Sequence, residues 1–246
     1  MSLPTEHDHP LDVQARTTGR GDDAPPPPSE DGERPVGRIR SWLADPLQAA
    51  LIAIPIAIFA LGAWTQRFLV EDAFIYFRVT DNIYEGAGPV FNAGERVEIF
   101  TSPLWTALLA VLRAPFGFLG MGHLSVYLGI VCSLGAVAFA VLAARRLNEL
   151  LRGAREAGEG IDWPLGLILV AALPPMWHWA TSGLETSLTF CWVAVSFWGL
   201  VNRMTADQHR LEPAWRPIWV PLVIGLGPLV RPDLGLVSAV LFLGLL

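Results

Sequence analysis

Four long stretches of the chain carry no charged side chain: residues 47–66, 114–144, 163–184 and 186–202. The hydrocarbon core of a bilayer is about 30 Å thick, so a helix of about 20 apolar residues crosses it. Several of these stretches are long enough to do so. The pattern therefore predicts an all-α fold, a polytopic bundle of transmembrane helices.

The composition supports this prediction. Of the 246 residues, 52% are hydrophobic and 16% are charged, and the mean hydropathy is +0.43. A soluble domain has roughly a quarter of its residues charged. These values exclude a soluble enzyme and a nucleic-acid-binding module, so we expect the lipid bilayer as a partner and no nucleic acid.

The ends of the chain differ from its middle. Residues 1–43 are polar and proline-rich and have little to bury, so we predict a disordered cytoplasmic tail there and a membrane domain over residues 44–246. Arginines 34, 38 and 40 precede the first span, and the positive-inside rule places that end in the cytoplasm. The final apolar run, residues 234–246, looks unfinished, which predicts a chain truncated at its C-terminus.

The second apolar block allows two topologies. Residues 103–112 either cross the membrane or form a short juxtamembrane or re-entrant helix. The second choice makes residues 124–144 the second span and keeps Arg145, Arg146, Arg152 and Arg155 inside, as the charge rule favours. The spans that follow are then 163–180 leading out, 187–202 returning, 218–230 leading out again and 234–246 starting a return, with Arg203, Arg210 and Arg216 cytoplasmic.

This topology gathers three polar segments on the outer face. They are the loop 67–100, the TSGLET turn at residues 181–186 and the RPD motif at residues 231–233. We therefore expect a large first extracytoplasmic loop, residues 67–113, with juxtamembrane helices and the candidate catalytic groups.

Within that loop, helical spacing places Asp72, Tyr76, Val79 and Ile83 on one face. A carboxylate thus starts an otherwise apolar stripe, where it could point into a cavity at the membrane surface. Glycines 86 and 88 and Pro89 are expected to end the helix, and residues 92–94 to form a turn. Glu71, Arg78 and Asn82 lie on a neighbouring face of this helix, and Glu95, Arg96 and Glu98 could form a solvated face of the loop that follows.

Structural explanations stand beside each of these functional ones. Acidic residues at positions 71 and 72 suit the helix dipole, and Thr181 or Ser182 could cap the next span. Arg231 could simply pair with Asp233, and His178 is more typical of the membrane interface than of a metal site. The cysteines, Cys132 and Cys191, lie in apolar spans and are expected to pack there. No metal-ligand spacing occurs.

Together, EDAFIYFR, GAGPVFNAGERVEIFTSPLW, TSGLET and LVRPDLGL resemble the GT-C superfamily of integral-membrane glycosyltransferases. The chain is most similar to the branch of terminal arabinofuranosyltransferases of actinobacterial cell-wall arabinan. The resemblance covers residues 67–236. Members commonly carry paired aspartates where this chain has Glu71 and Asp72, which favours Asp72 as the catalytic group.

The resemblance implies transfer of a sugar, arabinofuranose, from a polyprenyl-phosphate donor to a cell-wall polysaccharide outside the plasma membrane. Asp72 would be the general base and Glu71 its assistant, while Arg78 or Arg231 would hold the donor phosphate. A divalent cation could bridge carboxylate and phosphate, but nothing requires one, and no metal site is predicted. Three further residues are expected to contact substrate: Asn92, Glu185 and Asp233.

Two other functions stay open. A non-enzymatic membrane relative, such as one resembling a flagellar motor control protein, would keep the EDAFIYFR segment without needing a donor. A small transporter predicts ionisable residues near mid-membrane and often an inverted repeat. The sequence shows neither, because its ionisable residues gather at the ends of the spans.

Overall fold

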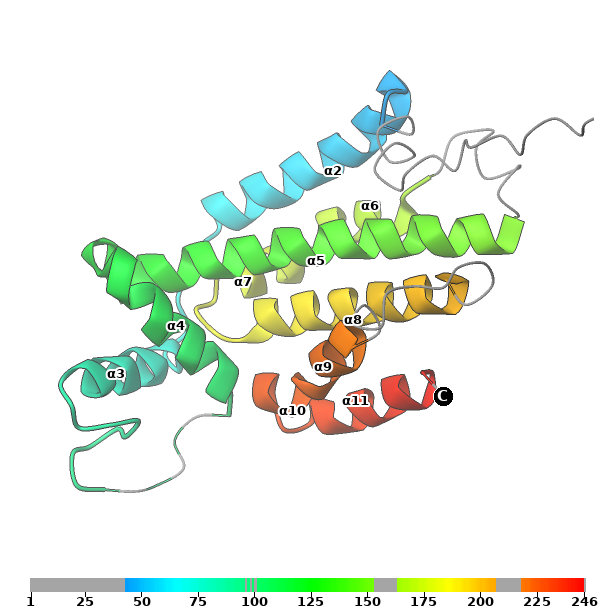
Figure 1. The fold of residues 1–246 in the computed structure, drawn as a ribbon. Helices are drawn as coiled ribbons and strands as arrows, with labels where there is room; N and C mark the ends of the chain where they lie inside the picture. The colour runs from blue at the N-terminus through cyan, green and yellow to red at the C-terminus, as the bar shows by residue number, and fades with distance from the viewer. Residues whose placement is uncertain are drawn as a thin grey trace, which may run out of the picture.

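The computed structural model describes residues 43–95, 97, 99, 101–152, 163–206 and 218–245. The predicted tail 1–42 and the expected cytoplasmic Arg155, Arg210 and Arg216 lie outside these residues. Regular structure within the described ranges is entirely helical (Figure 1). The all-α prediction is therefore confirmed for this part of the chain.

The described residues form the following helices, in chain order. Their bounds are α2 Pro46–Thr65, α3 Ala73–Tyr84, α4 Pro103–Phe116, α5 Met121–Arg152, α6 Leu165–Ala172, α7 Pro174–Ala180, α8 Thr186–Ala206, α9 Trp219–Gly225, α10 Gly227–Val230 and α11 Leu234–Leu243, with a short 3₁₀ turn, η1 Gly117–Leu119, before α5.

Two helices are long and apolar enough to cross a membrane. They are α2, with a mean hydropathy of 2.0, and residues Met121–Leu151 of α5, with a mean hydropathy of 2.3. Only 28% and 39% of their most apolar windows are buried inside the protein. Leu61 and Val131, for example, are 64% and 66% exposed. Apolar surface left open on two long helices suits contact with lipid, and the full polytopic bundle stays a prediction.

Two predicted spans are interrupted. Residues 163–180 form α6 and α7, because Leu173 takes an extended conformation with ψ of 107° before Pro174. A residue that precedes proline is pushed out of the helical region, and proline offers no N–H to continue the helix. Residues 218–230 form α9 and α10, which meet at Leu226, whose backbone stays in the helical region. Both predicted spans are thus divided into shorter helices, and their crossing of a membrane stays a prediction.

The long helices α5 and α8 lie side by side and form the centre of the bundle (Figure 1). Glycines let α5 approach both α7, which ends at Ala180, and α8, which contains Cys191. A Cβ at Gly129 would lie 2.3 Å from the carbonyl oxygen of Ala180, and one at Gly135 would lie 3.3 Å from Cys191 Sγ. Cys132 and Cys191 are both unpaired and belong to or pack against the core, as predicted.

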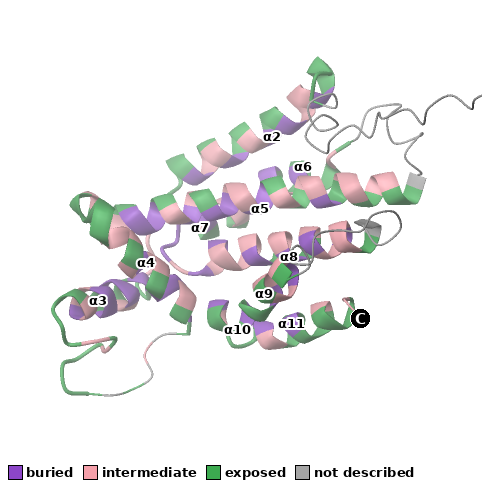
Figure 2. Cartoon of the chain, viewed as in Figure 1, coloured by how far each residue is buried: buried purple, intermediate pink, exposed green. Residues whose placement is uncertain are grey.

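Helices α3 and α4 lie together at one end of the bundle (Figure 1). A salt bridge between Arg113 and Asp81 joins them, and Tyr84 Oη donates to the carbonyl of Ala110 at 2.7 Å. Figure 2 shows that the inward side of α3 is buried while its outward side is exposed. The amphipathic pattern predicted for the loop helix is thus present, and it fixes which α3 side chains meet the bundle.

Candidate functional site

The turn between α7 and α8 is the centre of the candidate site. Thr181, Ser182 and Gly183 are buried, and Gly183 has a φ of +84°. The backbone N–H of Val70, just before α3, donates to the carbonyl of Ser182 at 3.0 Å. From α4, the indole N–H of Trp105 donates to the carbonyl of Gly183, also at 3.0 Å. The turn is therefore held by two segments that lie far from it in sequence.

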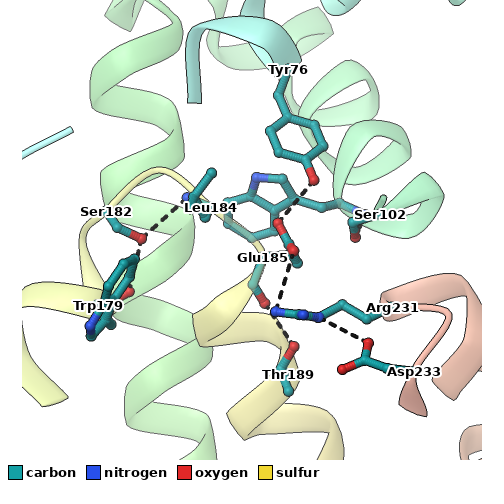
Figure 3. A network of polar contacts seen from close by, with 10 residues as sticks. Tyr76, Ser102, Trp179, Ser182, Leu184, Glu185, Thr189, Arg231 and Asp233 are labelled. Atoms are coloured by element: carbon teal, nitrogen blue, oxygen red, sulfur yellow. Dashed lines mark hydrogen bonds and ion pairs between the residues drawn. The ribbon is translucent and has the colours of Figure 1, made fainter. Parts of the chain in front are cut away.

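Glu185, the residue that follows this turn, joins three helices through its carboxylate (Figure 3). Its Oε2 accepts a hydrogen bond of 2.9 Å from Tyr76 Oη on α3, and its Oε1 lies 3.9 Å from Arg231 Nη1 after α10. Arg231 Nε also contacts Asp233 Oδ1 at 3.1 Å. We call Tyr76, Glu185, Arg231 and Asp233 the polar network.

The members of the polar network differ in their access to solvent. The Glu185 side chain is 8% exposed, whereas those of Arg231 and Asp233 are 42% and 64% exposed. A buried carboxylate needs hydrogen-bonding or cationic partners, and Tyr76 and Arg231 supply them to Glu185. Arg231 is thus held by two carboxylates while a large part of its side chain stays exposed.

Burial of the Tyr76 hydroxyl changes its pKa. Desolvation raises the pKa of Tyr76 far above its ordinary value, and the neighbouring Glu185 charge raises it further, while hydrogen bonds from Thr101 and the Ser102 backbone oppose the shift. Tyr76 therefore stays protonated at neutral pH and can only donate to Glu185. This direction of donation is what the ionised carboxylate requires.

The three polar segments of the sequence do converge. Tyr76 and Val70 come from the loop 67–100, Glu185 from the TSGLET turn, and Arg231 with Asp233 from the RPD motif. The pairing of Arg231 with Asp233 exists as well, so the structural explanation of that motif holds beside the functional one. Which side of a membrane this end of the bundle faces stays a prediction.

The predicted catalytic pair lies at the edge of the network. Glu71 and Asp72 are exposed and stand immediately before α3. Asp72 occupies the N-cap position but makes no side-chain capping hydrogen bond. Its carboxylate is one helical turn, about 6 Å along the axis, before Tyr76. Asp72 thus stands at the start of the apolar stripe, as expected. Tyr76 and Val79 of that stripe are buried, whereas Asp72 is exposed.

The other predicted substrate contacts are more scattered. Arg78 is exposed on α3. Asn92 lies in the predicted turn, where its side-chain amide donates to Glu95 Oε2 at 3.0 Å and Gly94 has a φ of +88°. No described contact joins either residue to the polar network. Two neighbours of Glu95 in the loop, Arg96 and Glu98, fall outside the described residues.

The structure revises one local interpretation, the cap of α8, and describes the surroundings of two other predicted features. Thr181 Oγ1 and Ser182 Oγ donate to the carbonyls of His178 and Trp179, so they bond to the end of α7 and do not cap α8. The His178 ring packs edge-on against Phe68 with their centroids 5.6 Å apart. Within the described ranges, no group of three or more His, Cys, Asp or Glu residues is placed to hold a metal ion, and the bridging cation stays a prediction.

Sequence reasoning missed two structural residues of this region. Trp105 is fully buried and holds the turn, although its position after a proline at the start of α4 gave no sign of its partner. Asn82 is 2% exposed, and its amide donates to the carbonyls of Val90 and Phe91 at 2.7 and 2.8 Å. The position of Asn82 beside the apolar stripe of α3 was the feature of the sequence that could have indicated its bonds to Val90 and Phe91.

Replacing Tyr76 with Phe keeps the ring and removes the hydroxyl, which donates to Glu185 and interacts with Thr101 and the Ser102 backbone. Hydrogen bonds to charged groups contribute about 1.5–3 kcal/mol, so we expect a loss of that order in the free energy of unfolding in detergent. Tyr84→Phe, which removes a partly exposed bond to a neutral carbonyl, is the matched control and should cost less. Equal losses in both variants would contradict the assignment.

The raised pKa of Tyr76 also predicts a pH dependence. The native state holds this proton more tightly than the unfolded chain, whose tyrosines ionise near pH 10. The stabilisation is therefore complete below about pH 10 and declines as the pH rises further. Between pH 8 and pH 11 the parent should lose more stability than Tyr76→Phe.

Comparison with known proteins places these residues in a wider context. The chain is 33% identical over 202 residues to the terminal beta-(1->2)-arabinofuranosyltransferase of Mycobacterium tuberculosis, a match that covers 82% of this chain and 30% of that protein. It is 30% identical over 200 residues to the protein of the same name from Corynebacterium glutamicum, covering 76% of this chain and 28% of the relative.

The chain therefore spans less than a third of the length of either relative. The resemblance to arabinofuranosyltransferases that the motifs suggested is confirmed. No protein-family model matches the chain, and no solved structure matches it.

Proposed function

We propose that this chain takes part in the transfer of an arabinofuranose unit from a polyprenyl-phosphate donor to an extracytoplasmic cell-wall glycan. The observation that carries the proposal is its similarity to two transferases of arabinofuranose over about four fifths of its length. The convergence of the TSGLET and RPD motifs with α3 supports a single site at that end of the bundle. We propose a multi-pass plasma-membrane location with this end outside.

In the proposed reaction, the acceptor hydroxyl attacks the anomeric carbon of the lipid-linked sugar. Asp72 takes the proton of that hydroxyl as the new glycosidic bond forms, and the bond between the sugar and the phosphate breaks. The polyprenyl phosphate leaves with the bonding electrons. Asp72 suits this role because its carboxylate is exposed and is not used to cap α3. Glu71, beside it, would contact acceptor hydroxyls.

Arg231 is the best placed of the two candidate arginines to bind the donor phosphate. A guanidinium presents several N–H donors in a planar fork that matches phosphate oxygens. Glu185 and Asp233 hold Arg231 from two sides while 42% of its side chain stays exposed. Because Glu185 is buried behind Arg231, we assign it to positioning the guanidinium, in place of the direct sugar contact expected from the sequence.

The test is sugar transfer by membranes that carry the chain, using a polyprenyl-phosphate arabinose donor and an arabinan acceptor. Arg231→Gln should lower transfer about 10- to 100-fold, the equivalent of ~1.5–3 kcal/mol for hydrogen bonds to a charged group. We expect the loss to appear chiefly as a higher KM for the donor. Arg203→Gln, near the other end of α8, is the matched loss of charge and should leave transfer unchanged.

Two results would contradict the proposal. The first is an absence of transfer by the parent chain with this donor. The second is an equal rate for the parent and for Arg231→Gln, which would remove Arg231 from the site while leaving the reaction class in place.

A further inference from the structure

A second polar feature lies apart from the polar network, at the ends of the two longest apolar helices. It is a cavity of about 190 Å³ between the C-terminal end of α2, the segment that follows it and the first turns of α5. Its walls include Trp64, Arg67, Phe68, His123, Val126 and Tyr127. We call it the arginine pocket.

The charge of the arginine pocket favours an anion. Arg67 is the charged residue in its lining, which contains no aspartate or glutamate. The Arg67 guanidinium lies 4.5 Å from the centre of the Trp64 ring, and its Nη1 donates to the Trp64 carbonyl at 2.6 Å. No carboxylate among the described residues forms a salt bridge with it. A guanidinium has five N–H donors, so it is held in place with donors to offer.

Aromatic rings form the other walls. Trp64 and Tyr127 lie nearly parallel, at 12°, with centroids 6.1 Å apart, and the His123 ring lies 6.4 Å from that of Tyr127. The Phe68 ring packs edge-on against the His178 ring, which limits its movement. Trp and Tyr are enriched where a membrane meets water, because their rings have both apolar and polar parts. Such walls suit a ligand in which an apolar hydrocarbon part adjoins a negatively charged group.

The size and place of the arginine pocket narrow the ligand further. Pockets for drug-sized molecules start at about 300 Å³, so a cavity of about 190 Å³ suits a single head group better than an oligosaccharide. Its lining residues lie where α2 ends and α5 begins. Figure 1 shows these two helix ends at the same end of the bundle, and both helices are apolar enough to cross a membrane. In a membrane-embedded protein this is the depth of lipid phosphates.

We infer that the arginine pocket binds the phosphate head group of an anionic phospholipid. Arg67 contacts the phosphate, and the Trp64 and Tyr127 rings contact the adjoining glycerol carbons. This inference rests on the proposed function for its membrane setting alone. It assigns no catalytic step to the pocket, since Asp72 and Arg231 are not part of its lining.

Native mass spectrometry of the detergent-purified chain tests the inference, with added phosphatidylglycerol, phosphatidylcholine or inorganic phosphate as probes. The parent should retain phosphatidylglycerol about tenfold more tightly than Arg67→Gln, and more tightly than it retains phosphatidylcholine. Val126→Phe, which fills the pocket and keeps the charge, should also lose the lipid. Arg113→Gln, a matched loss of charge at a residue already paired with Asp81, should bind as the parent does.

Equal retention of phosphatidylglycerol by the parent and Arg67→Gln would overturn the inference. So would displacement of the lipid by millimolar inorganic phosphate, because the ligand would then be the free anion. Sugar transfer measured on the same preparations separates this inference from the proposed function. If lipid retention depends on Arg67 but no sugar is transferred, only the proposed function is refuted. If sugar is transferred but retention does not depend on Arg67, only the lipid site is refuted.

Discussion

Asp72→Asn is expected to lower sugar transfer by about 10²- to 10⁴-fold, the usual contribution of a general base. The amide has the size of the carboxylate but cannot accept the proton of the acceptor hydroxyl. Because Asp72 is exposed and makes no capping hydrogen bond, the variant should keep the fold and the stability of the parent. The rate should therefore fall in kcat, with little change in the KM for the donor.

Two other carboxylates, one at each end of α3, provide the controls for this prediction. Glu71→Gln changes the adjacent residue and should have a smaller effect, since Glu71 is assigned to acceptor hydroxyls. Glu85→Gln lies at the other end of α3, is also exposed, and should have none. Full activity of Asp72→Asn together with loss in Glu71→Gln would move the general base to position 71. Full activity in all three variants would remove the base from this segment.

The largest loss of stability is expected from Gly183→Ala, in the turn that supports Glu185. A side chain in the left-handed region costs of order 1–3 kcal/mol, and overpacking adds about 1–3, so we expect about 2–6 kcal/mol in total. The φ of Gly183 is +84°, and a Cβ there would lie 2.7 Å from Ala73 Cβ and 2.9 Å from Leu69 Cδ2. Relief of this clash would push α3 away and separate Tyr76 from Glu185.

Substitutions at two other glycines separate the backbone cost of this loss from its packing cost. Gly88 has a φ of +85° with nothing within 4 Å of a Cβ, so Gly88→Ala reports the backbone cost alone. Gly166, in α6, has free space and a helical backbone, so Gly166→Ala should stay within about 1 kcal/mol of the parent or stabilise it. Free energies of unfolding in detergent give the ranking, and a Gly183→Ala value equal to that of Gly88→Ala would refute the packing role.

Local pattern was enough to predict several elements of this protein. Long uncharged runs predicted α2 and α5, because apolar length is a property of the segment alone. Apolar spacing predicted a helix with Tyr76 and Val79 on one face, which the structure shows as the buried face of α3, and the glycines after it ended that helix as expected. Pro174 is a local signal for the break between α6 and α7, because a proline pushes the residue before it out of the helical region.

The sequence by itself determined the helical class, the long apolar helices and the identity of the polar motifs, because each of these depends on residues close together in the chain. Only the tertiary structure decided that Glu185 accepts from Tyr76, 109 residues away, and lies against Arg231. It also turned Glu185 inward and left Asp72 exposed. Partners of this kind are set by how α3, α8 and α10 pack, and packing depends on side-chain shape and on glycine contacts that no local period encodes.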